Sequence, residues 1–186
     1  MEFSRFFPTS VIFCLFFSLP LSAQWIFQGG PELGHPLDFD KHGNRVYVCT
    51  SAGIFYTENQ GDLWTPVANN TPFTYPLRVL AEGGNLYVLN SARSLEYGGV
   101  SDLWRSADEG QTWQKIWAAN GIKSVAITDD SVAILTADSV FIAVDGGLDF
   151  AYRHKTPPLF PIIDIFWLQG DLHLTGEDEL HKTSDI

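Results

Sequence analysis

One short motif recurs along the chain and limits the folds that this sequence can adopt. The motif is a hydroxyl residue, an acid or amide two positions later, a glycine two positions after that, and an aromatic three positions further on. A motif that returns roughly every 40 residues is typical of a repeat architecture. Its copies lie at 57–64, 106–113 and 143–150, and a fourth begins at 183. The defining residues are Thr57, Asn59, Gly61 and Trp64; Ser106, Asp108, Gly110, Thr112 and Trp113; Asp145, Gly147 and Phe150; and Thr183 and Asp185.

A predicted hairpin precedes each copy of the motif. It consists of two short apolar strands joined by a tight turn, such as Gly83-Gly84-Asn85. Gly, Asn and Asp accept the positive φ that two-residue hairpin turns require. Each unit is therefore predicted to be a four-stranded antiparallel meander in which the motif joins the third strand to the fourth. The expected units are residues 36–70, 77–117, 122–154 and 162–186, the last of them incomplete.

The motif itself is predicted to be structural. Asp, Asn and hydroxyl side chains bond the backbone N–H groups of their own turn, and glycine takes a conformation that a side chain forbids. The aromatic begins the fourth strand and packs between neighbouring sheets. Turns one-two and three-four of a meander lie on the same face, so all copies of the motif are expected there as structural corners.

The composition agrees with a β protein and argues against several functions. Aromatic residues make up 14% of the chain, and its 16 Gly and 10 Pro residues are scattered, which favours many short turns. The net charge of −11 argues against binding to nucleic acid or to an anionic membrane surface. No metal-site spacing of Cys or His is present, so no cofactor is expected. The acidic stretch 171–179 is the one place for Ca²⁺, but it lacks an EF-hand spacing and is expected to be a solvated edge.

The N-terminus carries a predicted signal peptide, residues 1–23. Arg5 gives it a basic start, residues 11–19 are almost wholly apolar, and Leu21-Ser22-Ala23 has the small residues that signal peptidase needs. The mature chain is therefore expected to be secreted or held at the cell surface. No later segment is long and apolar enough to span a membrane. Cys49 is the one cysteine left after the signal, and its apolar neighbours predict a buried thiol.

The repeated motif resembles the Asp-box, or BNR repeat, of sialidases, sortilin-type receptors, xyloglucanases and photosystem II assembly factors. The copy at 106–113 matches the Asp-box pattern in full, and the other copies depart from it at positions such as Asn59 and Ala143. The resemblance covers about residues 36–186. It implies an all-β fold, a β-propeller built from four-stranded antiparallel blades.

The expected propeller, residues 24–186, is incomplete. About three and a half blades are present, fewer than the six or more that the resemblance implies, so the ring is not closed. Trp25-Ile26-Phe27-Gln28 resembles the fourth-strand segment Trp64-Thr65-Pro66-Val67. Residues 24–28 are therefore expected to form the last strand of the closing blade, whose other strands lie beyond Ile186. The remaining blades of the same chain would then be partners of this part.

The longer loops are predicted on the face opposite the motif, and loops on a rigid scaffold commonly carry binding residues. They are expected at 68–76, 91–99, 117–121 and 154–161. Aromatic side chains in these loops offer platforms for sugar rings, and charged side chains add hydrogen bonds. Packing of each aromatic under its own loop is the alternative. The candidate ligand-face residues are Phe73, Tyr75, Arg93, Glu96, Tyr97, Trp117 and His154.

Two functions remain open from the sequence. The first is a secreted, non-catalytic propeller that presents a binding surface for a protein or a glycan. The second is a glycoside hydrolase, sialidase-like or another Asp-box hydrolase, with catalytic residues mostly beyond residue 186. The Arg-Ile-Pro motif of sialidases is absent, and Arg78 is the one arginine near a family-like place.

A hydrolase with two carboxylates needs an acid pair roughly 5 to 10 Å apart. Four acids fall on predicted first strands or on the looped face: Asp38, Glu96, Asp164 and Glu177. Asp38 and Asp164 hold near-equivalent positions in the first and fourth units. The repeat therefore predicts that they lie blades apart around a central channel, where solvated carboxylates without a catalytic role are the alternative.

Overall fold

The structure is a computed structural model of the 186-residue chain. The predicted signal peptide at 1–23 and the predicted closing strand at 24–28 lie outside the residues that it describes, as do Arg93, Glu96, Tyr97, Glu177 and Asp185. The described residues are 30, 34–67, 71–91, 100–128, 130–150, 152–155, 162–176 and 180–183.

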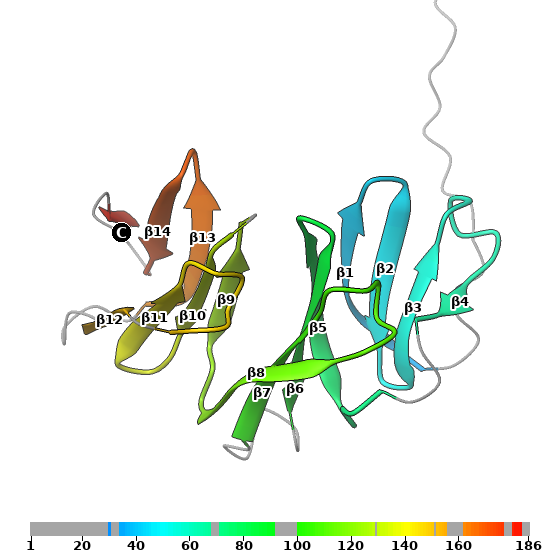
Figure 1. Cartoon of the computed structure of the whole chain (residues 1–186), viewed down its shortest axis with the longest axis horizontal. Coiled ribbons are helices and arrows are strands. Elements are labelled where there is room, and N and C mark those ends of the chain that lie inside the picture. Colours follow the sequence, from blue (N-terminus) through cyan, green and yellow to red (C-terminus); the bar gives the residue numbers. More distant parts are fainter. Residues whose placement is uncertain are drawn as a thin grey trace, which may run out of the picture.

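The described elements are β-strands, arranged in antiparallel sheets that follow one another along an open arc (Figure 1). Three sheets have four strands and the fourth has three, and each keeps its strands in chain order, which confirms the predicted all-β fold of meander blades. The described ranges contain no helix with the length and apolar character needed to cross a bilayer. The strands are β1 (Pro36–His42), β2 (Arg45–Thr50), β3 (Gly53–Thr57), β4 (Thr65–Pro66), β5 (Pro76–Glu82), β6 (Asn85–Ser91), β7 (Val100–Ser106), β8 (Gln114–Asn120), β9 (Ser124–Ile127), β10 (Val132–Leu135), β11 (Ser139–Ala143), β12 (Tyr152–Lys155), β13 (Asp164–Leu168), β14 (Asp171–Thr175) and β15 (Leu180–Thr183).

Tight hairpins join the first two strands of the first and second sheets. His42 pairs with Arg45 across the β1–β2 turn, and the β5–β6 hairpin closes in the same register. Gly43 and Gly84 take positive φ values of 61° and 79° in these turns, which glycine adopts without the penalty that a Cβ brings. The turns fix the register of the strands, because a slip of one residue would turn the buried face to solvent.

Three hydrophobic clusters hold the arc together, one at each junction between neighbouring sheets. The second strand of a sheet serves two of these junctions. In β6, Leu86 and Val88 pack toward the first sheet, whereas Tyr87 and Leu89 pack toward the third. Full burial of one such side chain contributes about 1.5 to 3 kcal/mol. The cores of this fold therefore lie between sheets.

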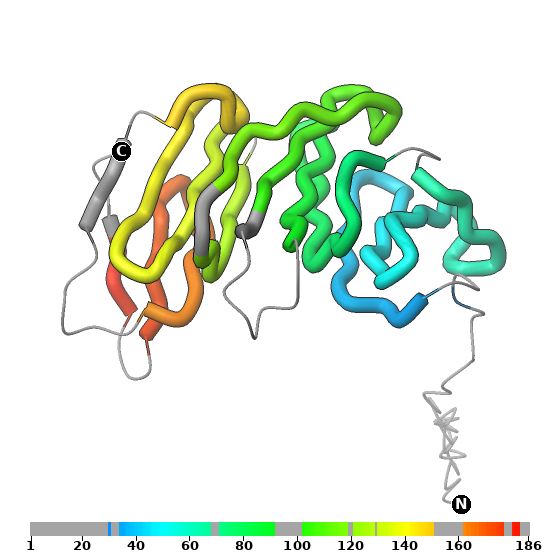
Figure 2. Tube along the Cα trace, turned by 90° about the horizontal axis from the view of Figure 1, so that it is seen from below, coloured from blue at the N-terminus to red at the C-terminus, as the bar shows by residue number. Residues whose placement is uncertain are grey.

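The first strands of the sheets form the inner side of the arc, where β1 packs against β5 and β9 packs against β13. Figure 2 shows the succession of sheets from a second direction, with β1 and β13 in different halves of the trace. Asp38 and Asp40 on β1 accept hydrogen bonds from the N–H groups of Val79 and Ala81 on β5, at 3.2 and 2.8 Å. These bonds join two sheets through their innermost strands.

Strands extend into two of the predicted loops, 117–121 and 154–161. Trp117 lies within β8, not in a loop beginning at 117, and His154 lies within β12, where its backbone pairs with Val140. The prediction for Cys49 is confirmed. Its side chain is fully buried, and this burial raises the pKa of the thiol to about 12.

Candidate functional site

The motif copies form the turns between the third and fourth strands, and we name 57–64, 106–113 and 143–150 the first, second and third box turns. In the first, the Thr57 hydroxyl accepts from Gly61 N–H at 3.0 Å and donates to Asn59 Oδ1 at 2.8 Å. In the second, Ser106 makes the equivalent bonds at 2.7 Å each, to Gly110 and Asp108. The hydroxyl, amide and Asp side chains of the motif in these two turns are therefore engaged in holding the turns themselves.

The two motif acids act as hydrogen-bond acceptors. Asp108 accepts from the hydroxyl and the N–H of Thr112, at 2.6 and 2.8 Å, and from Ser106. The Thr112 bonds are the main cause that lowers the pKa of Asp108 to about 2. The pKa of Asp145 is also lowered, first by the bond from Asp149 N–H. A general acid needs a raised pKa, whereas the pKa values of these two carboxylates are lowered. The carboxylates therefore act by holding the turn.

The box glycines have a packing reason as well as a conformational one. Gly110 has a φ of +88°, and a Cβ added there would lie 1.9 Å from Val67 Cγ1 of the first sheet. Gly147 has a φ of +90°, and its Cβ would lie 2.7 Å from Ile116 Cδ1 of the second sheet. Val67 and Ile116 both follow the box aromatic by three residues. Each of these box turns therefore seats its glycine on the fourth-strand segment of the preceding sheet.

A row of polar side chains occupies one register position on the four innermost strands. Because β1–β2, β5–β6, β9–β10 and β13–β14 pair in the same way, their partners identify these positions as equivalent. All four lie in the half of the strand that enters from the loop face, opposite the box turns. We name this set the inner-rim row: Asp38, Arg78, Ser124 and Asp164.

Hydrogen bonds and one ion pair connect the inner-rim row from sheet to sheet. Arg78 Nε lies 3.7 Å from Asp38 Oδ2, and Arg78 Nη1 donates to Ser124 Oγ at 3.4 Å. The Ser124 hydroxyl in turn donates to Asp164 Oδ1. The side chains of Arg78 and Asp38 are 38% and 29% exposed, whereas Ser124 is buried, so solvent reaches the row at Arg78 and Asp38. The two acids that the sequence placed around a channel are thus linked by a basic and a hydroxyl side chain.

The structure sorts the remaining candidate ligand-face residues. Tyr75 is 54% exposed and precedes β5, with its N–H bonded to Asn90 Oδ1 at 2.8 Å. Phe73 is buried against Trp113, with the ring centroids 5.1 Å apart, so its prediction as a ligand-face aromatic is wrong.

Trp117 belongs to the junction between the second and third sheets. Its ring lies 4.8 Å from the rings of both Phe141 and Phe150, so the exposed platform predicted for it is also wrong. His154 is placed only by its backbone on β12. Of the predicted ligand-face aromatics that the structure describes, Tyr75 is the exposed one.

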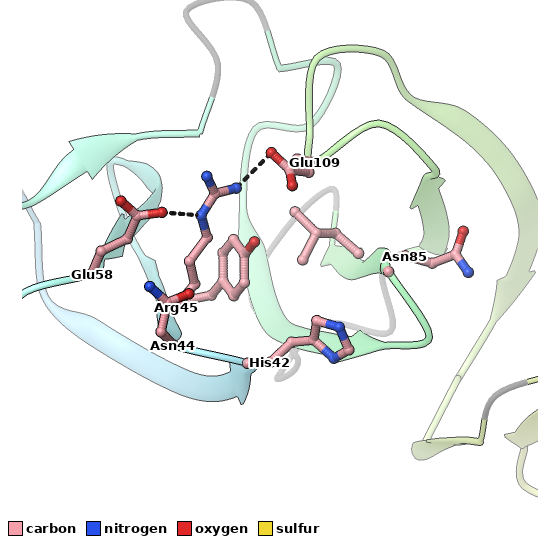
Figure 3. Close-up of a pocket in the computed structure, with 10 residues that line it drawn as sticks. His42, Asn44, Arg45, Glu58, Asn85 and Glu109 are labelled. Atoms are coloured by element: carbon pink, nitrogen blue, oxygen red, sulfur yellow. Dashed lines mark hydrogen bonds and ion pairs between the residues drawn. The ribbon is translucent and has the colours of Figure 1, made fainter.

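A polar pocket of about 230 Å³ lies on the turn face, between the first and second sheets (Figure 3). Arg45 extends from β2 and contacts a glutamate of each sheet. Its Nε lies 2.6 Å from Glu58 Oε1, and its Nη1 lies 2.6 Å from Glu109 Oε2. The hydrogen bond to Glu58, followed by the one to Glu109, raises the pKa of Arg45. The repeat pattern did not predict this pocket, because it identifies the turn face only with structural corners.

A metal site is not assembled in the described ranges, where no group of three or more His, Cys, Asp or Glu side chains comes together. Within the acidic stretch that was weighed for Ca²⁺, Asp171 Oδ2 instead lies 2.6 Å from Lys182 Nζ.

No protein-family profile matches this chain. Among known proteins it is similar to a xyloglucanase of Hypocrea jecorina (strain QM6a), with 27% identity over 129 residues. That match covers 64% of this chain and 15% of the xyloglucanase, so the chain spans a small part of that protein's length.

Solved structures share the fold at low sequence identity. The computationally designed Ika4 protein aligns with a TM-score of 0.58 and 9% identity, over 82% of this chain and 92% of Ika4. PorZ, a surface component of the type-IX secretion system of Porphyromonas gingivalis, aligns with a TM-score of 0.58 and 14% identity, over 80% of this chain and 19% of PorZ. A chain of a nidogen–laminin complex aligns with a TM-score of 0.54 and 12% identity, over 72% of this chain and 51% of that chain. These likenesses establish a β-propeller-like fold, of which the described sheets form an open part.

Proposed function

We propose that this protein is a secreted, non-catalytic β-propeller that presents a binding surface for a protein or a glycan, centred on the inner-rim row. The observation that carries this proposal is the change from Asp to Arg to Ser to Asp at one register position of four successive sheets. A position that the fold restricts to one residue type would repeat, as the box glycine does. The fold therefore does not restrict this position to one residue type, although Asp38 also accepts a bond from Val79 N–H of the next sheet.

The chemistry of the row suits a polar ligand. Arg78 donates hydrogen bonds, Asp38 and Asp164 accept them, and Tyr75 adds an exposed aromatic ring at the entrance to β5. Arginine and aromatic side chains are enriched in binding surfaces, and loops and strand ends on a rigid scaffold commonly carry them.

The finer family assignment belongs to the same proposal. The equivalent bonds of the first and second box turns support an Asp-box identity, and the apolar segment within residues 1–23 supports export by a cleavable signal peptide.

A glycoside hydrolase is the second candidate, because the chain is similar to a xyloglucanase. Asp38 and Asp164 are then the carboxylates of the row, and further catalytic residues are expected beyond residue 186. Arg78 and Ser124 lie between the two acids and engage both of them. A hydrolase instead keeps its two carboxylates on either side of the scissile bond, so the binding role fits the row better.

Titration calorimetry with xyloglucan oligosaccharides tests the binding role. We expect Arg78→Gln to weaken binding about tenfold, because one charge-assisted hydrogen bond is lost. Lys41→Gln is the matched control, since Lys41 is an exposed cation on β1 outside the row. Equal affinity of Arg78→Gln and the native chain would remove the row from the site. Release of reducing sugar from the same oligosaccharides would favour the hydrolase.

A further inference from the structure

The turn-face pocket is built from two sheets at their first junction. The β1–β2 hairpin and the first box turn supply one wall, and the β5–β6 hairpin and the second box turn supply the other. Figure 3 shows Arg45 between the two glutamates, with the His42 and Asn85 side chains on the other side of the pocket. The polar side chains that line it are His42, Asn44, Arg45, Glu58, Asn85 and Glu109.

The two glutamates of this pocket have no counterpart at the next junction between sheets. At the next junction, the position of Arg45 is held by Asn85 and that of Glu109 is held by Gly146. That junction has an arginine of its own, since a Cβ added at Gly146 would lie 3.2 Å from Arg105 Nη2, and the Tyr87 hydroxyl donates to the Gly146 carbonyl at 3.2 Å. The second junction thus closes with a guanidinium but without a pair of glutamates. The pocket is therefore a candidate for a second role.

The electrostatics of the pocket select the charge of a ligand. Arg45 engages one oxygen of Glu58 and one oxygen of Glu109. The glutamate side chains are 48% and 63% exposed. A cationic ligand would meet the Arg45 guanidinium, and an anionic ligand would meet two carboxylates. A neutral ligand with hydroxyl groups avoids both repulsions.

Hydroxyl groups also match the hydrogen-bonding groups on the walls. A hydroxyl donates to a carboxylate and accepts from an amide, and the pocket offers both through its Glu and Asn side chains. A volume of about 230 Å³ lies below the range of roughly 300 to 1,000 Å³ typical of pockets for drug-sized ligands. The pocket therefore suits one ring and not a long chain.

We propose that the turn-face pocket binds one neutral sugar residue, held by the carboxylates of Glu58 and Glu109 and by the amide of Asn44. This site lies on the opposite face from the inner-rim row, so it goes beyond the proposed function and does not depend on it.

Saturation-transfer NMR with the methyl glycosides of glucose, galactose, xylose and mannose, followed by titration of those that bind, tests this site on the whole secreted chain. We expect Glu109→Gln to weaken binding about tenfold, because a charge-assisted hydrogen bond becomes a neutral one. Asn44→Ala is expected to weaken it by a similar factor through loss of the amide. Gln111→Ala is the matched control, an exposed amide on the same box turn that does not line the pocket.

Three outcomes would overturn the site. The first is the absence of saturation transfer to all four glycosides at millimolar concentration. The second is unchanged affinity in both Glu109→Gln and Asn44→Ala. The third is loss of glycoside binding in Arg78→Gln, which would place the sugar at the inner rim. Melting curves accompany each variant, and if Glu109→Gln does not fold, Asn44→Ala decides the result, since Asn44 is an exposed turn residue.

Discussion

The box turns and the inner-rim row lie at equivalent places of successive sheets, yet they repeat in opposite ways. Each box turn keeps a glycine at its fifth position, and Gly110 and Gly147 press on the preceding sheet. The inner-rim row instead changes residue type from strand to strand, from Asp38 to Arg78 to Ser124. Packing restricts the box position to glycine, whereas the inner-rim position is restricted only to polar residues. This difference separates what the fold needs from what a ligand can use.

The largest expected effect is that of Gly110→Ala. The new methyl group would meet Val67 Cγ1 at 1.9 Å in a backbone held at a φ of +88°. We expect the free energy of unfolding to fall by about 3 kcal/mol or more, since both a steric clash and backbone strain contribute. Urea unfolding measures the loss.

Gly84→Ala is the control for this prediction, because Gly84 has a φ of +79° but a methyl group added there would meet no atom within 4 Å. Backbone strain alone is expected to lower the free energy of unfolding of Gly84→Ala by about 1 kcal/mol. The double variant Val67→Ala/Gly110→Ala should recover part of the loss, as the clashing methyl group is gone. Equal losses for Gly110→Ala and Gly84→Ala would show that the contact between sheets does not restrict the glycine.

The second prediction compares the acids of the second and third box turns. Asp108 accepts three bonds, from Ser106 and from two groups of Thr112, whereas Asp145 accepts two from backbone N–H groups. Asp108→Ala should therefore lower the melting temperature more than Asp145→Ala. Equal decreases in melting temperature for the two variants, or a larger decrease for Asp145→Ala, would contradict this prediction.

The same comparison has a pH signature. The pKa of Asp108 is about 2 in the folded chain, below its usual value of 3.8. Between pH 2 and pH 3.8 the unfolded chain therefore binds more protons than the folded chain. Its stabilising effect is fully present above pH 3.8 and is lost as the pH falls toward 2. The stability gap between the native chain and Asp108→Ala should narrow over that interval. A gap that stays constant would mean that the charge of Asp108 is not what holds the turn.

The sequence predicts the repeat and its hairpins well because their causes are local. Glycine at a positive φ, as at Gly84, and an acid that caps its own turn, as at Asp108, act within a few residues. Burial of Phe73 and Trp117 depends instead on rings of other strands, so two aromatics were misplaced on the ligand face.

The two sites differ in how far the sequence predicts them. Repeat equivalence placed Asp38 and Asp164 near the inner rim without revealing the bonds that join them to Arg78. The turn-face pocket depends on Arg45 meeting Glu109, which is 64 residues away. A charged residue at a turn position that the next unit fills with Asn was the one signal that pointed to it. The sequence pattern predicts contacts within a turn, but it does not predict contacts between sheets.

The smallest expected effect on stability is that of Arg78→Gln. Its guanidinium lies 3.7 Å from Asp38 Oδ2 with both side chains partly exposed, a geometry in which an ion pair contributes about 0.5 kcal/mol. Asp38 keeps its bond from Val79 N–H at 3.2 Å, so no buried acceptor is left unsatisfied. Urea unfolding should therefore place this variant within about 1 kcal/mol of the native chain even though ligand binding weakens. A decrease in the free energy of unfolding as large as that of Gly110→Ala would mean that Arg78 of the inner-rim row is needed to hold the sheets together. The box turns and the inner-rim row would then not differ in their importance for the fold.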